Sequence, residues 1–445
     1  MREKDLLQRS EKMIRIEFQK LFGRFDYNVI LNKDGLTILT GPNGYGKSTI
    51  LKSIEAIGNE FNGLKFFFQL DFEKITVSFE NNKKFIIKKD NGKLILDDVI
   101  IERNIVERYE EFKERMYRRN YFIKIEEDNL IDKKEQLNNG ILLNDDYYIE
   151  YLYEKEINLK NKKDSKFEKI LKKIKTLKQC VGKIYFIREQ RLIKEKNKNR
   201  NRRGMFDEQE IINVIDELPN RLKELMISVQ QDYSTVASKL DSTYPGRLFK
   251  TKDGITEDEY NQKIKEMSYK FELLNKYDLS TMQESVEVVF KNEHAKALKI
   301  YFEDFDVKYR VYEDFINKLD LYTDIINNRL SFKSIKISKE LGISIVDEKN
   351  RVLELNQLSS GEKQEIVLFY DLIFETEKDV LLLIDEPEIS LHITWQKKFM
   401  DDLLKIINYK KFNVIVATHS PQIINNHWDR QVDLGELYGM QLNKN

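Results

Sequence analysis

The octapeptide Gly41 to Ser48, G-P-N-G-Y-G-K-S, has the residue types and the spacing that hold a chain of phosphates. Its glycines allow successive backbone N–H groups to point at phosphate oxygens, and a helix beginning at its end adds a partial positive charge. In this pattern Lys47 reaches the β- and γ-phosphates, and the Ser48 hydroxyl ligates Mg²⁺. The residues that we expect to bind a nucleoside triphosphate are Asn43, Gly44, Gly46, Lys47, Ser48 and Thr49.

A pair of acids closes an apolar segment much later in the chain, in V-L-L-L-I-D-E-P from Val380 to Pro387. An apolar run without alternation indicates a buried strand, so Asp385 lies at a strand's carboxyl end, where open α/β sheets bind ligands. Asp385 can hold Mg²⁺ directly or through water. Glu386 points to a different side, where it can take a proton from the water that attacks the γ-phosphate.

Two further motifs complete the set, L-S-S-G-E-K-Q at Leu358 to Gln364 and T-H-S-P at Thr418 to Pro421. Together with the lysine loop at Gly41 and the acids at Asp385 and Glu386, they resemble the ATP-binding-cassette (ABC) ATPases of the SMC, Rad50 and OLD branch. The resemblance implies ATP and Mg²⁺ as cofactors. It also implies a homo-oligomer in which two ATPase heads sandwich two nucleotides.

The resemblance assigns roles to the residues of these two motifs. Ser359, Ser360 and Gly361 stand at the start of a helix, where they would cap the γ-phosphate held by the opposite subunit's lysine loop. His419 matches the switch histidine that contacts the γ-phosphate. The expected catalytic residues are therefore Glu386 and His419.

The resemblance also implies a glutamine that links Mg²⁺ to the arm lobe. Gln190, in F-I-R-E-Q-R-L, is the candidate, and Gln69 is the second choice. A polar surface glutamine remains the other interpretation of Gln190. The expected metal ligands are Ser48, Asp385 and Gln190.

These motifs need strands and helices that position them. Three short segments predict strands of a parallel sheet covered on both faces: Leu36 to Thr40, Val380 to Ile384 and Val414 to Ala417. Ile75 to Phe79 and Phe85 to Lys88 predict a hairpin, because turn-forming asparagines separate them. We therefore expect the lysine loop to connect a strand to a helix, and the acids and His419 to follow strands.

The middle of the chain is helical in pattern and rich in charge, which predicts an insertion between two parts of one head. We expect the fold class to be α/β, an ABC-type P-loop ATPase head with a predominantly helical, charged insertion lobe. Within the lobe, S-T-Y-P-G at Ser242 to Gly246 predicts a turn. The expected domains are the N-terminal part of the head (1–99), a charged helical insertion (100–183), a basic loop and helical lobe (184–330), and the C-terminal part of the head (331–445).

Composition excludes several classes of protein. Lys plus Arg equals Asp plus Glu at 76 each, so net charge cannot by itself drive binding to nucleic acid or membrane. A single cysteine, Cys180, excludes a disulfide framework within the chain and a C-x-x-C metal site. No apolar run approaches the roughly 18 residues of a membrane span, and residues 1–13 lack a signal peptide's apolar stretch. We therefore expect a cytoplasmic protein.

One stretch in the middle of the chain has a local excess of basic residues. Between Lys155 and Arg203 the chain has 19 Lys or Arg against 5 Asp or Glu. The bland interpretation is a solvated face, and the alternative is a site for nucleic acid or a protein partner.

Several members of the branch do not fit. The chain has no sustained heptads of the kind that build the long coiled coils of SMC and Rad50 proteins, and no zinc hook. About 310 residues separate the lysine loop from L-S-S-G-E, which argues against a transporter cassette. Only 26 residues follow His419, so the TOPRIM nuclease domain of OLD proteins is not expected.

The remaining resemblance is to stand-alone ATPases of bacterial anti-phage systems, such as AriA of PARIS and PtuA of Septu. It implies a sensor or regulatory subunit that controls a separately encoded TOPRIM or HNH nuclease and responds to a phage protein. The chain itself would have no nuclease activity. The alternatives are a RecF-like DNA-repair ATPase that binds DNA through the basic stretch, and an ATP-dependent scaffold.

Overall fold

The structure, a computed structural model, describes residues 12–118, 165–188, 193–195, 211–280, 290–389 and 391–442. The chain divides into two compact units. Unit 1 comprises Met1–Arg188, Lys378–Pro387 and Ile407–Asn445, and unit 2 comprises Glu189–Glu377 and Glu388–Ile406. The lysine loop, the two acids and His419 therefore belong to unit 1, whereas L-S-S-G-E belongs to unit 2.

Unit 1 contains two sheets. Five strands form a parallel sheet in the order β16-β3-β15-β14-β8, and six form an antiparallel sheet in the order β2-β1-β4-β5-β6-β7. The parallel strands are β3 (Leu36–Thr40), β8 (Ile184–Ile187), β14 (Leu381–Asp385), β15 (Asn413–Ala417) and β16 (Gln431–Asp433). The antiparallel strands are β1 (Met13–Leu21), β2 (Phe25–Ile30), β4 (Lys74–Phe79), β5 (Lys84–Asp90), β6 (Lys93–Leu96) and β7 (Val99–Ile101). The pairing of β4 with β5 confirms the expected hairpin.

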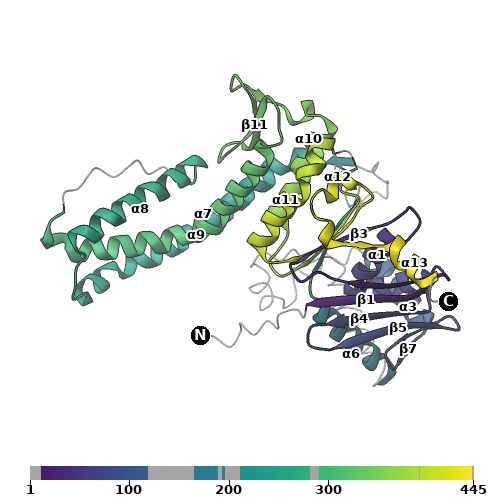
Figure 1. Cartoon of the computed structure of the whole chain (residues 1–445). Coiled ribbons are helices and arrows are strands. Elements are labelled where there is room, and N and C mark those ends of the chain that lie inside the picture. Colours follow the sequence, from purple (N-terminus) through teal and green to yellow (C-terminus); the bar gives the residue numbers. More distant parts are fainter. Residues whose placement is uncertain are drawn as a thin grey trace. The chain divides into compact units, whose positions relative to one another are not determined.

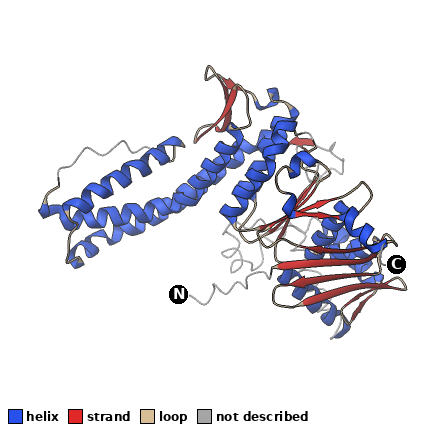
Figure 2. Cartoon of the chain, viewed as in Figure 1, coloured by secondary structure: helices blue, strands red, loops and turns tan. Residues whose placement is uncertain are grey.

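Helices cover one face of the antiparallel sheet (Figure 2). Among the described residues, the helices of unit 1 are α1 (Lys47–Gly58), α2 (Glu60–Gln69), α3 (Arg103–Arg118), α6 (Ser165–Val181), α12 (Pro421–Ile424) and α13 (Leu434–Leu442). One contiguous apolar core joins α1, α2 and α6 to strands of both sheets. The two elements that flank the lysine loop, β3 and α1, therefore both belong to this packed core.

The parallel sheet brings the motifs together. All five residues of β3 are buried, as expected for a strand covered on both faces. Asp385 of β14 lies opposite Ala417 of β15, and Ala417 lies opposite Leu39 of β3. Because the strands are parallel, their carboxyl ends share one edge, and the lysine loop, the acids and His419 follow there.

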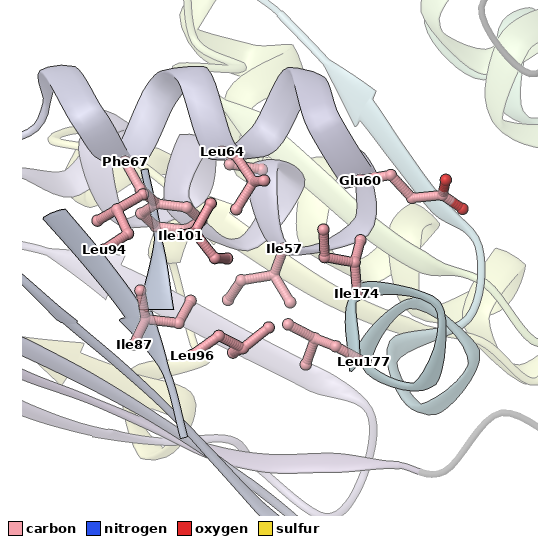
Figure 3. Close-up of a pocket in the computed structure, with 11 residues that line it drawn as sticks. Ile57, Glu60, Leu64, Phe67, Ile87, Leu94, Leu96, Ile101, Ile174 and Leu177 are labelled. Carbon is pink, nitrogen blue, oxygen red and sulfur yellow. The ribbon is translucent and has the colours of Figure 1, made fainter. Parts of the chain in front are cut away.

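A small cavity of ≈ 20 Å³ lies in the core of unit 1 (Figure 3). Its lining is apolar apart from Glu60, whose carboxylate points away from the apolar side chains and pairs with Lys178 Nζ at 2.7 Å. This volume holds about one water molecule. The cavity is a packing void and not a ligand site.

Unit 2 combines helices with small antiparallel sheets. Helices α7, α8 and α9 run alongside one another (Figure 1). The helices are α7 (Val214–Lys250), α8 (Glu257–Lys276), α9 (Ala295–Asn327) and α10 (Ser360–Tyr370), followed by the π-helical turn η4 (Asp371–Glu375). The strands are β9 (Ile193–Glu195), β10 (Ile211–Asn213), β11 (Lys333–Ser338), β12 (Gly342–Asp347) and β13 (Val352–Leu353). Helix α11 (Ile393–Lys410) begins in unit 2 and ends in unit 1.

The turn expected at Ser242 to Gly246 is wrong, because α7 continues through Pro245. Proline cannot donate a backbone hydrogen bond and usually breaks a helix. Here side chains of the same helix satisfy nearby carbonyls: Arg247 Nη2 donates to Leu240 O at 2.9 Å, and Thr243 Oγ1 donates to Lys239 O at 3.0 Å. Arg247 also forms an ion pair with Asp304 of α9, with Nη2 2.7 Å from Asp304 Oδ2, so packing between helices overrides the local turn signal.

A buried arginine ties three helices of unit 2 together. Arg329, just beyond α9, has a side chain that is 1% exposed. It forms ion pairs with Glu365 of α10 and, at 2.6 Å, with Asp402 of α11, and its guanidinium lies 4.6 Å from the Phe369 ring centroid. Two carboxylates and an aromatic face compensate the buried charge. The end of α9 is thereby fixed to α10, the helix that begins at L-S-S-G-E.

This architecture confirms the expected fold class. The parallel sheet with the lysine loop between β3 and α1 forms the ABC-type P-loop head, and α7, α8 and α9 form the helical lobe. None of the helices in the described part of the chain combines the length and the apolar character needed to cross a membrane.

Candidate nucleotide site

The lysine loop joins β3 to α1 and takes its shape from its glycines. Gly44 and Gly46 have φ angles of 83° and 90°, in the left-handed region that glycine adopts without strain. A Cβ at Gly46 would also lie 3.3 Å from side-chain atoms of Leu21 and Phe22. Lys47 opens α1 and is 5% exposed, and its Nζ donates to the Gly41 carbonyl oxygen at 2.8 Å. The ammonium is thus held against the loop that would cradle phosphate oxygens.

Ser48 and Asp385 meet beside the loop. The Ser48 hydroxyl donates to Asp385 Oδ1 at 3.0 Å, although the two residues lie 337 positions apart in the chain. A hydroxyl and a carboxylate are both hard oxygen donors, the kind that Mg²⁺ prefers. The two side chains therefore fit the expected Mg²⁺ site.

Glu386 lies next to Asp385 in an unusual backbone conformation. Its φ is 46°, in the left-handed region that residues other than glycine rarely adopt, and its N–H donates to Ala417 O at 2.9 Å. Strain of this kind concentrates at functional sites. Glu386 Oε2 lies 2.5 Å from His419 Nδ1, and the Glu386 side chain is 17% exposed. His419 therefore orients the carboxylate that we expect to act as the general base.

The C-terminal segment supports the loop from beside β3, and sequence reasoning missed this contribution. Asp433 Oδ1 accepts hydrogen bonds from the N–H groups of Gly435 and Glu436 at 2.7 and 3.0 Å, which caps α13. Its Oδ2 accepts from Thr40 Oγ1 at 2.8 Å, on the residue that precedes the loop. The segment D-L-G-E-L was the available signal, because an acid before an apolar helix start is typical of an N-cap.

An aromatic cluster continues this support onto the loop itself. Tyr438 of α13 lies with its ring centroid 4.9 Å from Phe25 and 6.0 Å from Tyr45, a loop residue. Tyr27 donates its hydroxyl proton to Tyr45 O at 3.0 Å, and burial raises the pKa of Tyr27 above its ordinary value. Strand β2, the loop and α13 are thereby packed together.

Ser359 in unit 2 is the N-cap of α10, where it forms a capping box. Its Oγ accepts from Glu362 N at 3.3 Å, and Glu362 Oε2 accepts from Ser359 N at 2.8 Å. Because the hydroxyl oxygen is an acceptor here, its proton is available to donate elsewhere. The expected start of a helix at L-S-S-G-E is confirmed.

Lys333 of β11 holds this capping box and was also missed. Its Nζ donates to both carboxylate oxygens of Glu362, at 2.9 and 3.0 Å. Burial would raise the pKa of Glu362, but the hydrogen bonds from Lys333 and Ser359 outweigh it, so that pKa lies below its ordinary value. No local pattern links residues 29 positions apart, so the sequence carried no signal for this pair.

Replacing Lys333 with Met should therefore lower the stability of unit 2 by about 1–2 kcal/mol near neutral pH. A carboxyl with a lowered pKa stabilises the folded state above its ordinary pKa, roughly 4.3, and loses that contribution as pH falls through its lowered value. The difference between wild type and Lys333→Met should thus be constant from about pH 6 to 8 and should shrink below about pH 4.

Urea unfolding followed at several pH values measures this difference. Lys336→Met is the matched control, because Lys336 lies on the same strand and its Nζ donates to the neutral side chain of Asn350. A stability loss that stayed the same at every pH would show that Lys333 acts through packing and not through the charge of Glu362.

The structure thus brings some expected residues together and leaves others apart. In unit 1, Lys47, Ser48 and Asp385 gather at the edge of the sheet where the Glu386–His419 pair lies. Asn43 and Gly44 lie in the exposed loop, and Thr49 is in the first turn of α1. Ser360 and Gly361, like Ser359, belong to unit 2.

The expected Mg²⁺-linking glutamine is not tested by the fold. Gln190 lies outside the described residues. Strand β8, which precedes it, pairs in parallel with β14 so that Ile187 lies opposite Ile384. Gln69, the second choice, is exposed at the end of α2. Gln190 therefore stays a prediction.

Comparison with known proteins gives one family match. A family model described as "AAA ATPase domain" matches residues 14–424 of this chain. The match spans both units and includes all four motifs. No curated protein matches the chain.

Solved structures of head domains are also similar, at low identity. An Smc head domain with an extended coiled coil from Pyrococcus furiosus, bound to the C-terminal domain of ScpA, is 13% identical, covers 93% of this chain and 90% of its own, and has a TM-score of 0.38. The SMC head domain from Thermotoga maritima is 12% identical over 93% and 91%, with a TM-score of 0.33. An Smc head bound to the C-terminal winged-helix domain of ScpA is 11% identical over 93% and 90%, with a TM-score of 0.35.

Proposed function

This chain belongs to the AAA ATPase domain family, and from that premise we propose that it binds ATP with Mg²⁺ and hydrolyses it as a dimer of heads. Each composite site combines the lysine loop, Asp385, Glu386 and His419 of one subunit with Ser359 of the other. The observation that carries the proposal is the meeting of Ser48 with Asp385, and of Glu386 with His419, at one edge of the parallel sheet. A glycine-rich turn without a role in nucleotide binding is not expected to lie beside both pairs of residues.

In ATP hydrolysis, water attacks the γ-phosphate, and each residue of the site has a separate role. The loop amides and Lys47 hold the phosphates, and the fixed N-terminus of α1 adds positive charge. Ser48 and Asp385 would hold Mg²⁺, which neutralises charge on the β- and γ-phosphates when bound. Glu386, oriented by His419, takes a proton from the attacking water.

Ser359 contributes from the opposite subunit. Its hydroxyl oxygen already accepts from Glu362 N, so its proton can be donated to a γ-phosphate oxygen. The N–H groups of Ser360 and Gly361 in the first turn of α10 would add to that donation. ATP thus favours the closed pair of heads, because each subunit contacts the nucleotide of the other.

The test is phosphate release by the purified chain. With ATP and Mg²⁺ it should turn over, and removal of Mg²⁺ with EDTA should abolish turnover, because Ser48 and Asp385, whose oxygens lie 3.0 Å apart, would then hold no cation against the phosphates. Turnover that persisted in EDTA would contradict the assigned roles of Ser48 and Asp385.

For the biological role, we propose a sensor or regulatory subunit of a bacterial anti-phage system that controls a separately encoded TOPRIM or HNH nuclease in the cytoplasm. The support is the resemblance of the sequence to the PARIS and Septu ATPases, together with the fixed link between the helical lobe and α10 through Arg329. Through this link, a movement of the helical lobe can change the position of α10 and of Ser359, which contributes to the neighbouring subunit's ATP site. A nuclease gene beside this one supports the role, and a replication operon supports the RecF-like alternative.

A prediction follows for the purified chain with Mg²⁺ or Mn²⁺: it should cut neither DNA nor RNA, with or without ATP. Apart from the group that contains Glu386 and His419, the described residues form no cluster of carboxylates and histidines able to hold a metal ion. Two-metal cleavage needs such a cluster. Metal-dependent cleavage that survives in Glu386→Gln and disappears on mutation elsewhere would sink the partner-nuclease role.

A further inference from the structure

An open groove lies on unit 2, away from the residues assigned to ATP. It runs between the first turn of α7, the strands β12 and β13, and residues 354–356, and its volume is ≈ 380 Å³. That volume lies within the roughly 300–1,000 Å³ of ligand-binding pockets. The groove is large enough to take several side chains.

The walls of the groove are fixed by close packing. Gly342, at the start of β12, has a φ of 66°, and a Cβ there would lie 2.1 Å from the Pro219 carbonyl oxygen. Only glycine allows β12 to approach α7 so closely. The groove is thus built into the fold and does not depend on a mobile loop.

Its floor and rim are apolar side chains, two of which are exposed. Leu341 and Val352 are 46% and 63% exposed, beside the lining residues Pro219, Ile343, Leu353 and Leu355. Apolar side chains that gather in a concave surface mark a binding site more often than single exposed ones do. The lining therefore favours an occupant with apolar side chains.

The charges that line the groove have one sign. Asp216 and Glu354 are its charged residues, and none of the described lining residues is basic. Asp216 is exposed in the first turn of α7, where the helix N-terminus stabilises its negative charge, and no described residue forms an ion pair with it. Glu354 accepts a hydrogen bond from Asn356 Nδ2 at 2.9 Å, but it has no cation among the described residues.

The groove also runs along the edge of a sheet. In the order β11-β12-β13, β13 is an outer strand, so one side of its backbone is not paired within this sheet. An extended polypeptide can add to such an edge and place alternate side chains in a neighbouring groove.

We propose that this groove binds an extended segment of a partner protein that carries apolar side chains next to lysine or arginine. Its apolar side chains contact Leu341 and Val352, and its cations pair with Asp216 and Glu354. Because residues 355–357 lead directly to Leu358 and Ser359, the groove adjoins in sequence the serine that would contact ATP.

A library of random dodecapeptides displayed on phage and selected on the full chain tests this inference. Enriched peptides should combine apolar residues with Lys or Arg. As synthetic peptides they should bind the double variant Asp216→Lys/Glu354→Lys about tenfold more weakly than wild type, since two attractions become repulsions. Val352→Asp should weaken them as well.

The matched control is Glu257→Lys/Glu348→Lys, which makes the same charge change in the first turn of α8 and in the turn after β12, outside the groove. It should bind the peptides like wild type. Circular dichroism and ATP turnover show whether each variant folds. Enrichment of acidic peptides, binding unaffected by both groove variants, or the absence of any enrichment over the double variant would overturn the proposal.

Discussion

Glu386→Gln should bind ATP as wild type does and lose hydrolysis by about 100-fold or more. Glutamine keeps the shape of the side chain and can still hydrogen-bond to His419, but it cannot take a proton from water. Because the loop, Lys47 and Asp385 are untouched, nucleotide affinity should stay within about twofold. Phosphate release and equilibrium binding of labelled ATP measure the two effects separately.

Glu80→Gln is the matched control for this change. Glu80 is an exposed acid directly after β4, so Glu80→Gln makes the same carboxylate-to-amide exchange outside the nucleotide site. It should leave both binding and turnover unchanged. A wild-type rate in Glu386→Gln would show that another group is the base, and a loss of ATP binding would show that Glu386 shapes the site instead of acting on water.

The loop and the acids could be predicted from sequence because their chemistry is local. Gly44 and Gly46 are needed by a backbone with positive φ, and the apolar residues before Asp385 can only form a buried strand. Parallel pairing then brings the carboxyl ends together without further information. Four motifs in the expected order were therefore enough to predict the head.

The residues that position the site through contacts distant in sequence could not be predicted in the same way. Lys333 reaches Glu362 across 29 positions, and Asp433 reaches Thr40 across 393, so each pair exists only after the sheets have formed. The continuation of α7 through Pro245 is likewise accompanied by an ion pair between Arg247 and Asp304 of α9, 57 positions apart in the chain. These contacts are tertiary, and a pattern of neighbouring residues contains no trace of them.

Ser359→Arg and Lys47→Ala should each abolish turnover in a pure preparation, for different reasons. Lys47→Ala damages the half-site that a subunit builds with its own loop, since the alanine cannot reach the phosphates. Ser359→Arg places a bulky cation where the opposite subunit's γ-phosphate would be capped, and it removes the N-cap of α10. Circular dichroism should show that both variants stay folded, since a lost cap costs only about 1 kcal/mol.

Mixing these two inactive variants tests the shared site most directly. In a mixed dimer both lesions fall in one composite site, and the other site keeps an intact Lys47 and an intact Ser359. With subunit exchange confirmed by differently tagged chains, mixing should restore turnover toward a quarter of the wild-type rate, because about half of the dimers are mixed and each has one intact site. Full activity of Ser359→Arg by itself, or no recovery despite confirmed exchange, would contradict an ATP site shared between two subunits.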